Sequence, residues 1–109
     1  MLPAINRLKS DKDFKNIFKS GRTLENQFLR VKFLKNHKNI SRFGFIVSTK
    51  ISKRANIRNT LKRRLRAIVI SLIKDFKTGF DIVIWPKTAS TTLDYKDLFE
   101  NLYNLISTL

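Results

Sequence analysis

The chain has 109 residues, of which 23 are Lys or Arg and eight are Asp or Glu, so its formal net charge is +15. Hydrophobic residues make up 42% of it, which is ordinary for a folded protein and argues against disorder. With no cysteine and one histidine, the sequence excludes disulfides, thiolate zinc sites and a histidine-based metal cluster. The length predicts a single domain over residues 1–109, and the excess of positive charge indicates a polyanionic partner.

The first predicted helix begins at Ser10 and ends before Gly21. Asp13 follows Ser10 at the spacing of a capping box. Phe14 and Phe18 stand four residues apart on one face of this helix. Taken alone, this spacing favours packing of both rings in the core.

Strands are predicted next. Residues 28–35 alternate between apolar side chains and the cations Arg30 and Lys32, which predicts a half-exposed strand. Residues 42–50 predict a second strand, and residues 22–25 a further short one.

The second helix is predicted over residues 58–77, where one wide apolar stripe recurs at helical spacing. Residues 80–85 predict a strand that Pro86 ends, with Trp85 packed at its end. Residues 94–107 predict the last helix. The order of helix, three strands, helix, strand and helix defines an α+β fold, a two-layer sandwich in which helices pack on one small sheet.

Cations gather at the start of the second helix and in the loop before it. Every charged residue between Glu25 and Asp75 is Lys or Arg. Each exposed cation near a helix N-terminus opposes the helix dipole by roughly 0.3–1 kcal/mol, so local stability does not explain the arrangement, whereas binding to phosphates does. We call the candidates for phosphate binding here the cationic ridge: Lys50, Lys53, Arg54, Arg58, Asn59, Lys62, Arg63 and Arg66. Helical spacing predicts that Arg58, Lys62 and Arg66 form one row, which borders the apolar stripe instead of opposing it.

The sequence shows no carboxylate pair, no nucleophile with a base and no Gly-rich phosphate loop, so we predict no catalytic residue and no metal site. Asp11, Asp13, Asp94 and Asp97 are interpreted as helix-start residues, and His37 as an exposed loop residue. No apolar run approaches the roughly 20 residues of a membrane span, and the N-terminus lacks the apolar core of a signal peptide. We therefore expect a cytoplasmic protein with no membrane partner.

The stretch KRANIRNTLKRRLR resembles the Arg-Asn-Arg signature helix of the bacterial ribonuclease P protein subunit. The resemblance continues over almost the whole chain, because RLKSDKDFKNIFKSG, RFGFIVSTK and FDIVIWPKTAS follow in the order of that family. The chain departs from the family pattern at Thr49 and Thr60, where a cation is usual, and at Ala67, where Glu often stands. The first two departures each remove an expected phosphate contact.

The resemblance implies the order αβββαβα with a left-handed βαβ crossover, as in domain 2 of ribosomal protein S5. It also implies a subunit of a ribonucleoprotein that removes the 5′ leader of precursor tRNA, in which the catalytic RNA with bound Mg²⁺ performs the hydrolysis. The protein would bind that RNA through the ridge. It would hold the single-stranded leader in a cleft lined by Phe14, Phe18, Arg30 and Lys32, where rings stack on bases and cations follow phosphates. The family often has an aromatic residue at the position of Lys32, so stacking from that strand would be weaker here.

Two alternatives stay open at this point. One is a stand-alone protein that binds structured RNA, like a ribosomal protein, without a processing function. The other is a protein-only nuclease, against which the missing catalytic constellation argues. No protein partner is predicted.

Overall fold

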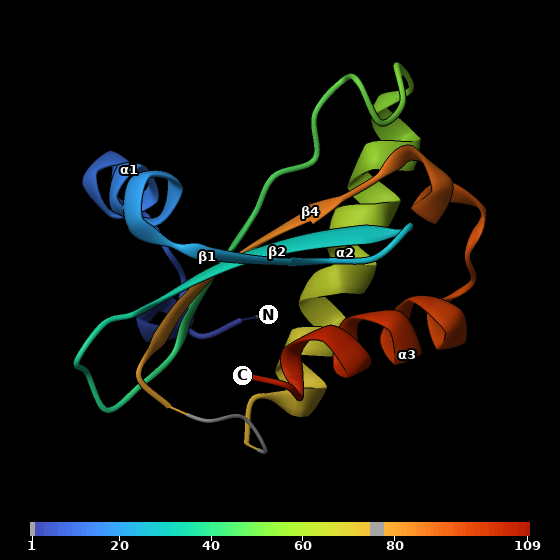
Figure 1. The fold of residues 1–109 in the computed structure, drawn as a ribbon. Helices are drawn as coiled ribbons and strands as arrows, with labels where there is room; N and C mark the ends of the chain where they lie inside the picture. The colour runs from blue at the N-terminus through green and yellow to red at the C-terminus, as the bar shows by residue number, and fades with distance from the viewer. Residues whose placement is uncertain (1, 75–77) are drawn as a thin grey trace.

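The computed structural model describes residues 2–74 and 78–109, and their elements follow the predicted order αβββαβα (Figure 1). The elements are α1 (Asp11–Ser20), β1 (Arg22–Glu25), β2 (Leu29–Lys35), β3 (Arg42–Phe45), α2 (Ala55–Leu72), β4 (Phe80–Pro86) and α3 (Tyr95–Ile106), with the short 3-10 helices η1 (Ala4–Asn6) and η2 (Thr88–Thr92). Within the described residues, no helix is long and apolar enough to cross a membrane.

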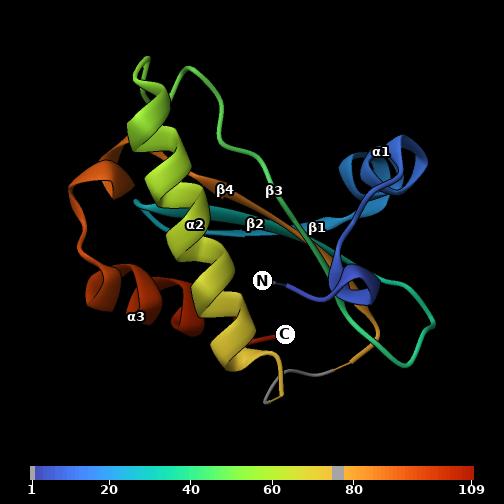
Figure 2. The same ribbon diagram turned by 180° about the vertical axis from the view of Figure 1, so that it is seen from behind.

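The sheet has the strand order β1-β2-β4-β3, so β1 and β3 form its two edges. β2 pairs antiparallel with both β1 and β4, whereas β3 pairs parallel with β4. The connection from β3 to β4 runs through α2. In Figure 2, where α2 lies in front of the sheet, β4 is to the left of β3 along their common direction, so the crossover is left-handed as the resemblance implied.

Helices cover both faces of the sheet. α2 and α3 lie on one face, where residues of alternate strand positions, such as Val31, Ile82 and Ile84, are fully buried against them. α1 lies on the opposite face, where Ile17 packs with Val83. The period-two alternation of β2 and β4 therefore supplies side chains to both layers, and the surfaces beside α1 and α2 point away from each other (Figures 1 and 2).

β3 is shorter than predicted, because it ends at Phe45 rather than at residue 50. The pairing continues for one further bond, in which the Ile46 N–H donates to the Ile84 carbonyl at 3.0 Å. The next bond of the same parallel ladder would need the N–H of residue 86, which is proline and has none. A residue of the partner strand thus ends β3.

α2 starts at Ala55, three residues before the predicted start at residue 58. Half-buried Ile57 stands four residues before Leu61 and extends the apolar stripe by one turn. The helix ends at Leu72, and the predicted continuation reaches residues 75–77, which lie outside the described residues.

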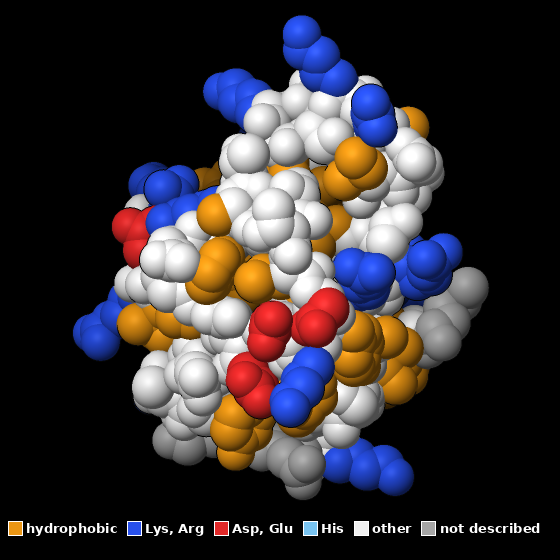
Figure 3. Space-filling model, turned by 90° about the vertical axis from the view of Figure 1, so that its right-hand side faces the viewer, with side chains coloured by type: hydrophobic (Ala, Val, Ile, Leu, Met, Phe, Trp, Pro, Cys, Tyr) orange, Lys and Arg blue, Asp and Glu red, His pale blue; other side chains and the backbone are white. Residues whose placement is uncertain are grey.

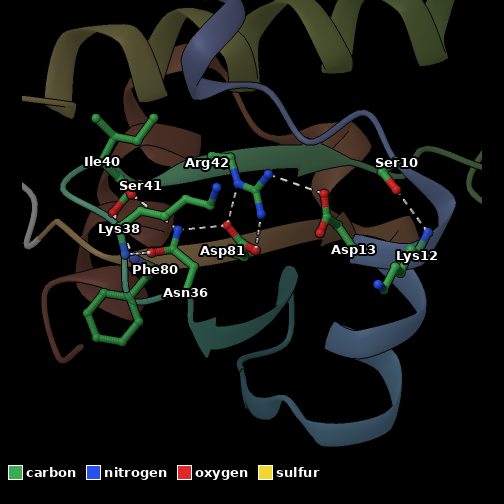
Figure 4. Close-up of polar contacts among 10 residues, drawn as sticks. All are labelled: Ser10, Lys12, Asp13, Asn36, Lys38, Ile40, Ser41, Arg42, Phe80 and Asp81. Atoms are coloured by element: carbon green, nitrogen blue, oxygen red, sulfur yellow. Dashed lines mark hydrogen bonds and ion pairs between the residues drawn. The ribbon is translucent and has the colours of Figure 1, made fainter.

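Arg42 joins α1 to the sheet through two carboxylates (Figure 4). Its guanidinium donates to Asp81 on β4 at 2.6 and 2.8 Å and to Asp13 on α1 at 3.2 Å. Asn36 donates to the same Asp81 carboxylate at 2.8 Å. Ser10 caps α1 as predicted by accepting from the Lys12 N–H, but Asp13 directs its carboxylate to Arg42, so the capping-box prediction is only half right.

Candidate nucleic-acid interface

The cationic ridge lies along one flank of α2 and in the loop before that helix. Arg58 and Lys62 are half-buried at the border of the apolar stripe, while Asn59, Arg63 and Arg66 are exposed. This pattern confirms the predicted geometry, in which the row borders the stripe instead of opposing it. The helix can therefore pack on the sheet and present the ridge to a partner at the same time.

The loop before α2 is shaped by its own serines. The Ser48 hydroxyl accepts from the Lys50 N–H at 3.3 Å, and the Ser52 hydroxyl accepts from the Arg54 N–H at 3.2 Å. Arg58 donates to the Ser52 carbonyl at 2.8 Å. Arg58 consequently holds the loop that carries the other ridge cations, a positioning contact that the sequence did not predict.

In the part of the chain that the structure describes, the ridge also lacks ion pairs with acidic residues. Among residues 2–74 and 78–109, the ion pairs join Arg30 and Lys87 to Glu25 and Arg42 to Asp13 and Asp81, and none includes a ridge residue. α2 also begins without a capping side chain or an acidic residue in its first turn. Its N-terminal end therefore adds the positive end of the helix dipole to the charge of the ridge.

Thr60, the third residue of the signature triplet, lies on the other flank of α2. It is half-buried and lines a small pocket together with Arg64, Ser90 and Thr91. Arg64 reaches across this pocket to the Leu93 carbonyl, although the contact is long at 3.4 Å. The missing cation at position 60 thus leaves the row of Arg58, Lys62 and Arg66 unchanged.

α3 carries the opposite charge. Asp94, Asp97 and Glu100 are exposed at its start, with Lys96 between them. Figure 3 shows acidic side chains together in the middle of this side of the molecule and Lys and Arg at its top, where the loop before α2 lies. A polyanion that approaches α2 would be repelled from this region.

On the opposite face of the sheet, Phe18 lies beside Trp85 with their ring centroids 5.4 Å apart. The Phe18 side chain is 43% exposed. Lys32 donates to the Phe18 carbonyl at 3.3 Å, and Arg30 pairs with Trp85 in the register of β2 and β4. We call Phe18, Trp85, Arg30 and Lys32 the α1-side surface, since it combines aromatic rings with cations beside α1.

Two aromatic residues of this region bear on the sequence predictions. Trp85 packs in part against the buried cluster of Leu8, Ile17 and Val83, as its interpretation as a packed strand end implied, and its half-buried ring also extends the aromatic surface of Phe18. Phe14 is half-buried over β3: a Cβ built on Gly44 would lie 2.7 Å from the Phe14 ring. The two helix rings are 6.2 Å apart but face different surroundings. The alternation of Trp85 with Ile84 could have placed the tryptophan on the α1 side.

Glu25 and Lys87 complete the α1-side surface, and the sequence analysis did not select either of them. The Glu25 carboxylate accepts from Arg30 at 3.1 Å and pairs with Lys87 at 3.0 Å. Hydrogen bonds from Lys87 and Arg30, together with their positive charges, lower the pKa of Glu25 below its usual 4.5. Arg30 is therefore partly neutralised, unlike the cations of the ridge.

These features define a class: a small basic α+β domain that presents a cationic helix on one face and aromatic rings with cations on the other, as RNA-binding domains do. The family model described as Ribonuclease P matches residues 2–109. The chain therefore belongs to the family of ribonuclease P protein components. As such it is a protein subunit of the endoribonuclease that processes the 5′ end of tRNA, and its partner is an RNA.

Curated relatives agree over nearly their full lengths. The ribonuclease P protein component of Clostridium botulinum (strain 657 / Type Ba4) is 34% identical over 102 residues, which cover 93% of this chain and 91% of the relative. That of Pseudanabaena sp. (strain PCC 6903) is 35% identical over 108 residues, with 98% and 93% covered.

Solved structures share the fold. The ribonuclease P protein from Thermotoga maritima superposes with a TM-score of 0.87 at 36% identity, covering 94% of this chain and 96% of that one. The Staphylococcus aureus ribonuclease P protein superposes with a TM-score of 0.84 at 24% identity, covering 94% of both chains, and supports the fold alone.

Proposed function

We propose that the cationic ridge binds the catalytic RNA of ribonuclease P and that the α1-side surface holds the single-stranded 5′ leader of precursor tRNA. One observation carries this proposal. Among the described residues no ridge cation has an acidic partner, whereas Arg30, Arg42 and Lys87 each pair with a carboxylate. Arg is common in the ridge, and its planar guanidinium suits bidentate contacts to phosphate.

The two surfaces support separate tasks. Because α2 and α1 lie on opposite faces of the sheet, RNA can bind at the ridge without covering Phe18 and Trp85. Exposed rings flanked by cations suit an unpaired strand, in which bases are free to stack. We place Phe14 at the margin of this surface, since its ring is mostly packed over Gly44.

Hydrolysis is assigned to the RNA with Mg²⁺ held mainly by the RNA and the substrate. Within residues 2–74 and 78–109, no group of three or more His, Cys, Asp or Glu side chains lies close enough to hold a metal ion. The protein contributes binding and orientation of the leader, and we expect this work to take place in the cytoplasm.

Reconstitution tests the proposal. The full chain, added to ribonuclease P RNA at low Mg²⁺, should raise the rate at which precursor tRNA loses its leader, while the protein alone should cut nothing. A variant with Lys53 and Arg63 changed to Ala should require more protein for the same rate. The proposal fails if the chain does not stimulate the RNA, or if it cleaves precursor tRNA without RNA.

A further inference from the structure

A pocket of about 310 Å³ lies at the open edge of β3, and side chains from the N-terminal segment, α1 and α2 line it. Leu8, Phe14 and Phe45 supply apolar surface to it. Gly44 allows the close approach of the Phe14 ring to the strand, since any side chain there would meet the ring at 2.7 Å. The volume is at the lower end of the range for small-molecule sites.

The charged residues that line this pocket are all cations: Arg7, Lys62 and Arg66. Lys62 and Arg66 belong to the ridge and approach from α2, while Arg7 approaches from the N-terminal segment. The pocket is thus continuous with the ridge. Its charge and its apolar lining together suit an anion that carries a flat apolar body.

The edge of β3 adds hydrogen-bonding groups. The Leu8 N–H donates to the Phe43 carbonyl at 2.9 Å, so the backbone of Phe43 points to the open edge, whereas that of Ile46 points to β4. Backbone groups alternate in direction along a strand, so the N–H and C=O of Phe45 also point to the open edge. The bridge between Arg7 and Phe43 is isolated, because the next residues lead into α1 instead of following β3.

We propose that this pocket receives one unpaired nucleotide of the RNA that the ridge binds. The base lies against Phe14 and Phe45, and its polar edge meets the backbone N–H and C=O of Phe45. Its phosphate meets Lys62 and Arg66 from α2 and Arg7 from the N-terminal segment. This inference rests on the proposed function, since the occupant belongs to the RNA held by the ridge. It extends that function from phosphate contacts, which carry no sequence information, to a contact with a base.

Binding of adenosine 5′-monophosphate to the free chain tests the pocket directly. In ¹⁵N-labelled protein, the nucleotide should shift the amide signals of Leu8, Gly44 and Phe45 in a saturable way, and Arg7→Ala should weaken that binding. Ribose 5-phosphate, which lacks the base, should leave the same signals in place. Lys9→Ala is the matched control, because Lys9 is an exposed cation two residues from Arg7 that does not line this pocket.

Several results would overturn the inference. Equal shifts with ribose 5-phosphate would indicate a phosphate site without a base. Shifts confined to Phe18 and Trp85 would place the nucleotide on the α1-side surface. Shifts of the pocket amides by the peptide acetyl-Asp-Leu-Phe, but not by the nucleotide, would assign the pocket to a protein partner.

Binding to the full ribonuclease P RNA separates this inference from the proposed function. If both hold, Arg7→Ala should lower the slope of log affinity against log salt by about 0.7, the value for one phosphate of a single strand, and Lys9→Ala should leave it unchanged. If the chain binds the RNA but the two variants behave alike, the pocket is not part of the interface. If the chain does not bind the RNA, the proposed function fails first.

Discussion

Arg42 and the ridge cations come from the same acid-free part of the sequence, yet the fold treats them in opposite ways. The Arg42 side chain is 17% exposed and contacts two carboxylates, one from α1 and one from β4. The ridge cations contact no carboxylate among the described residues and stand beside an uncapped helix start. The comparison shows that positive charge is structural where acids distant in sequence converge on it, and free for a partner where they do not.

The carboxylates around Arg42 also change its pKa. A hydrogen bond from Arg42 to Asp81, supported by the negative charges of Asp81 and Asp13, raises the pKa of Arg42 above its usual value. The ion pairs with Asp81 and Asp13 therefore favour the charged form of Arg42.

The largest expected effect is on stability, from Arg42→Ala. This change leaves the Asp81 side chain, which is only 8% exposed, without its charge partner. Removal of one member of a buried ion pair typically costs about 3 kcal/mol or more, so the free energy of unfolding in urea, followed by Trp85 fluorescence, should fall by about that amount. Lys96→Ala on α3, which removes an exposed cation, should change it by less than about 0.5 kcal/mol.

The salt dependence of RNA binding by folded Arg42→Ala protein should match that of the parent chain. A fall of the salt slope with intact stability would show that Arg42 contacts phosphate, and the distinction between the two regions would be lost.

The next effect is on RNA affinity, from Lys53→Ala combined with Arg63→Ala. Both side chains are exposed and belong to the ridge. Removal of one phosphate contact should lower the salt slope by about 0.9, so the slope of the double variant should be smaller by about 1.8 in filter-binding measurements from low to physiological salt. Its unfolding free energy should not fall, because neither Lys53 nor Arg63 joins an ion pair among the described residues and cations near a helix N-terminus oppose its dipole.

The control for this variant removes the same charge from other faces, by changing Lys12 and Lys96 to Ala. Both are exposed, on α1 and α3 respectively. If the control lowers the slope as much as the ridge variant, binding follows net charge alone and the ridge has no special position.

The contrast between the ridge and Arg42 also separates what the sequence predicted from what it did not. The helical and strand periods placed the ridge beside the apolar stripe and predicted the order of all seven main elements, because these patterns are local. The counting of charges along the chain failed for Arg42, since Asp81 lies 39 residues away and meets it only through the parallel pairing of β3 with β4. The early end of β3 depends in the same way on Pro86 in the neighbouring strand.

The α1-side surface shows a similar limit. Phe14 and Phe18 lie four residues apart on the same face of α1, so the sequence pattern treats them alike. Only the tertiary structure distinguishes the packed ring of Phe14 from the exposed ring of Phe18. The sequence predicts the packing of Trp85 but contains no local signal that links it to Phe18, which lies 67 positions earlier and whose ring centroid is only 5.4 Å away. Whether these residues contact the leader stays a prediction.

A smaller effect is expected from Phe18→Ala, and it should concern the substrate alone. Loss of one base–aromatic stack costs about 1–3 kcal/mol, so the reconstituted holoenzyme should bind precursor tRNA less tightly while its affinity for mature tRNA is unchanged. Tyr103→Ala on α3 is the matched control, because that ring is 46% exposed, close to the 43% of Phe18. Equal losses for precursor and mature tRNA would remove the leader from the α1-side surface.

The smallest effect concerns Glu25→Gln, which releases Arg30 and Lys87 from their shared carboxylate. Because the folded state lowers the pKa of Glu25 below 4.5, its ion pairs stabilise the fold above that pH, and this stabilisation is lost as the pH falls through the lowered value. The parent chain should therefore have the slightly higher urea midpoint at pH 7, and the difference from Glu25→Gln should vanish at a pH well below 4.5.

Glu25→Gln should have the opposite effect on leader binding. Arg30 and Lys87 without an acid partner should bind the strand more tightly and steepen the salt dependence of binding, whereas Glu100→Gln should change neither quantity. A midpoint difference that persists once Glu25 is protonated would mean that this residue acts through its shape or hydrogen bonds rather than its charge, and neutralisation by Glu25 would then not explain how the α1-side surface differs from the ridge.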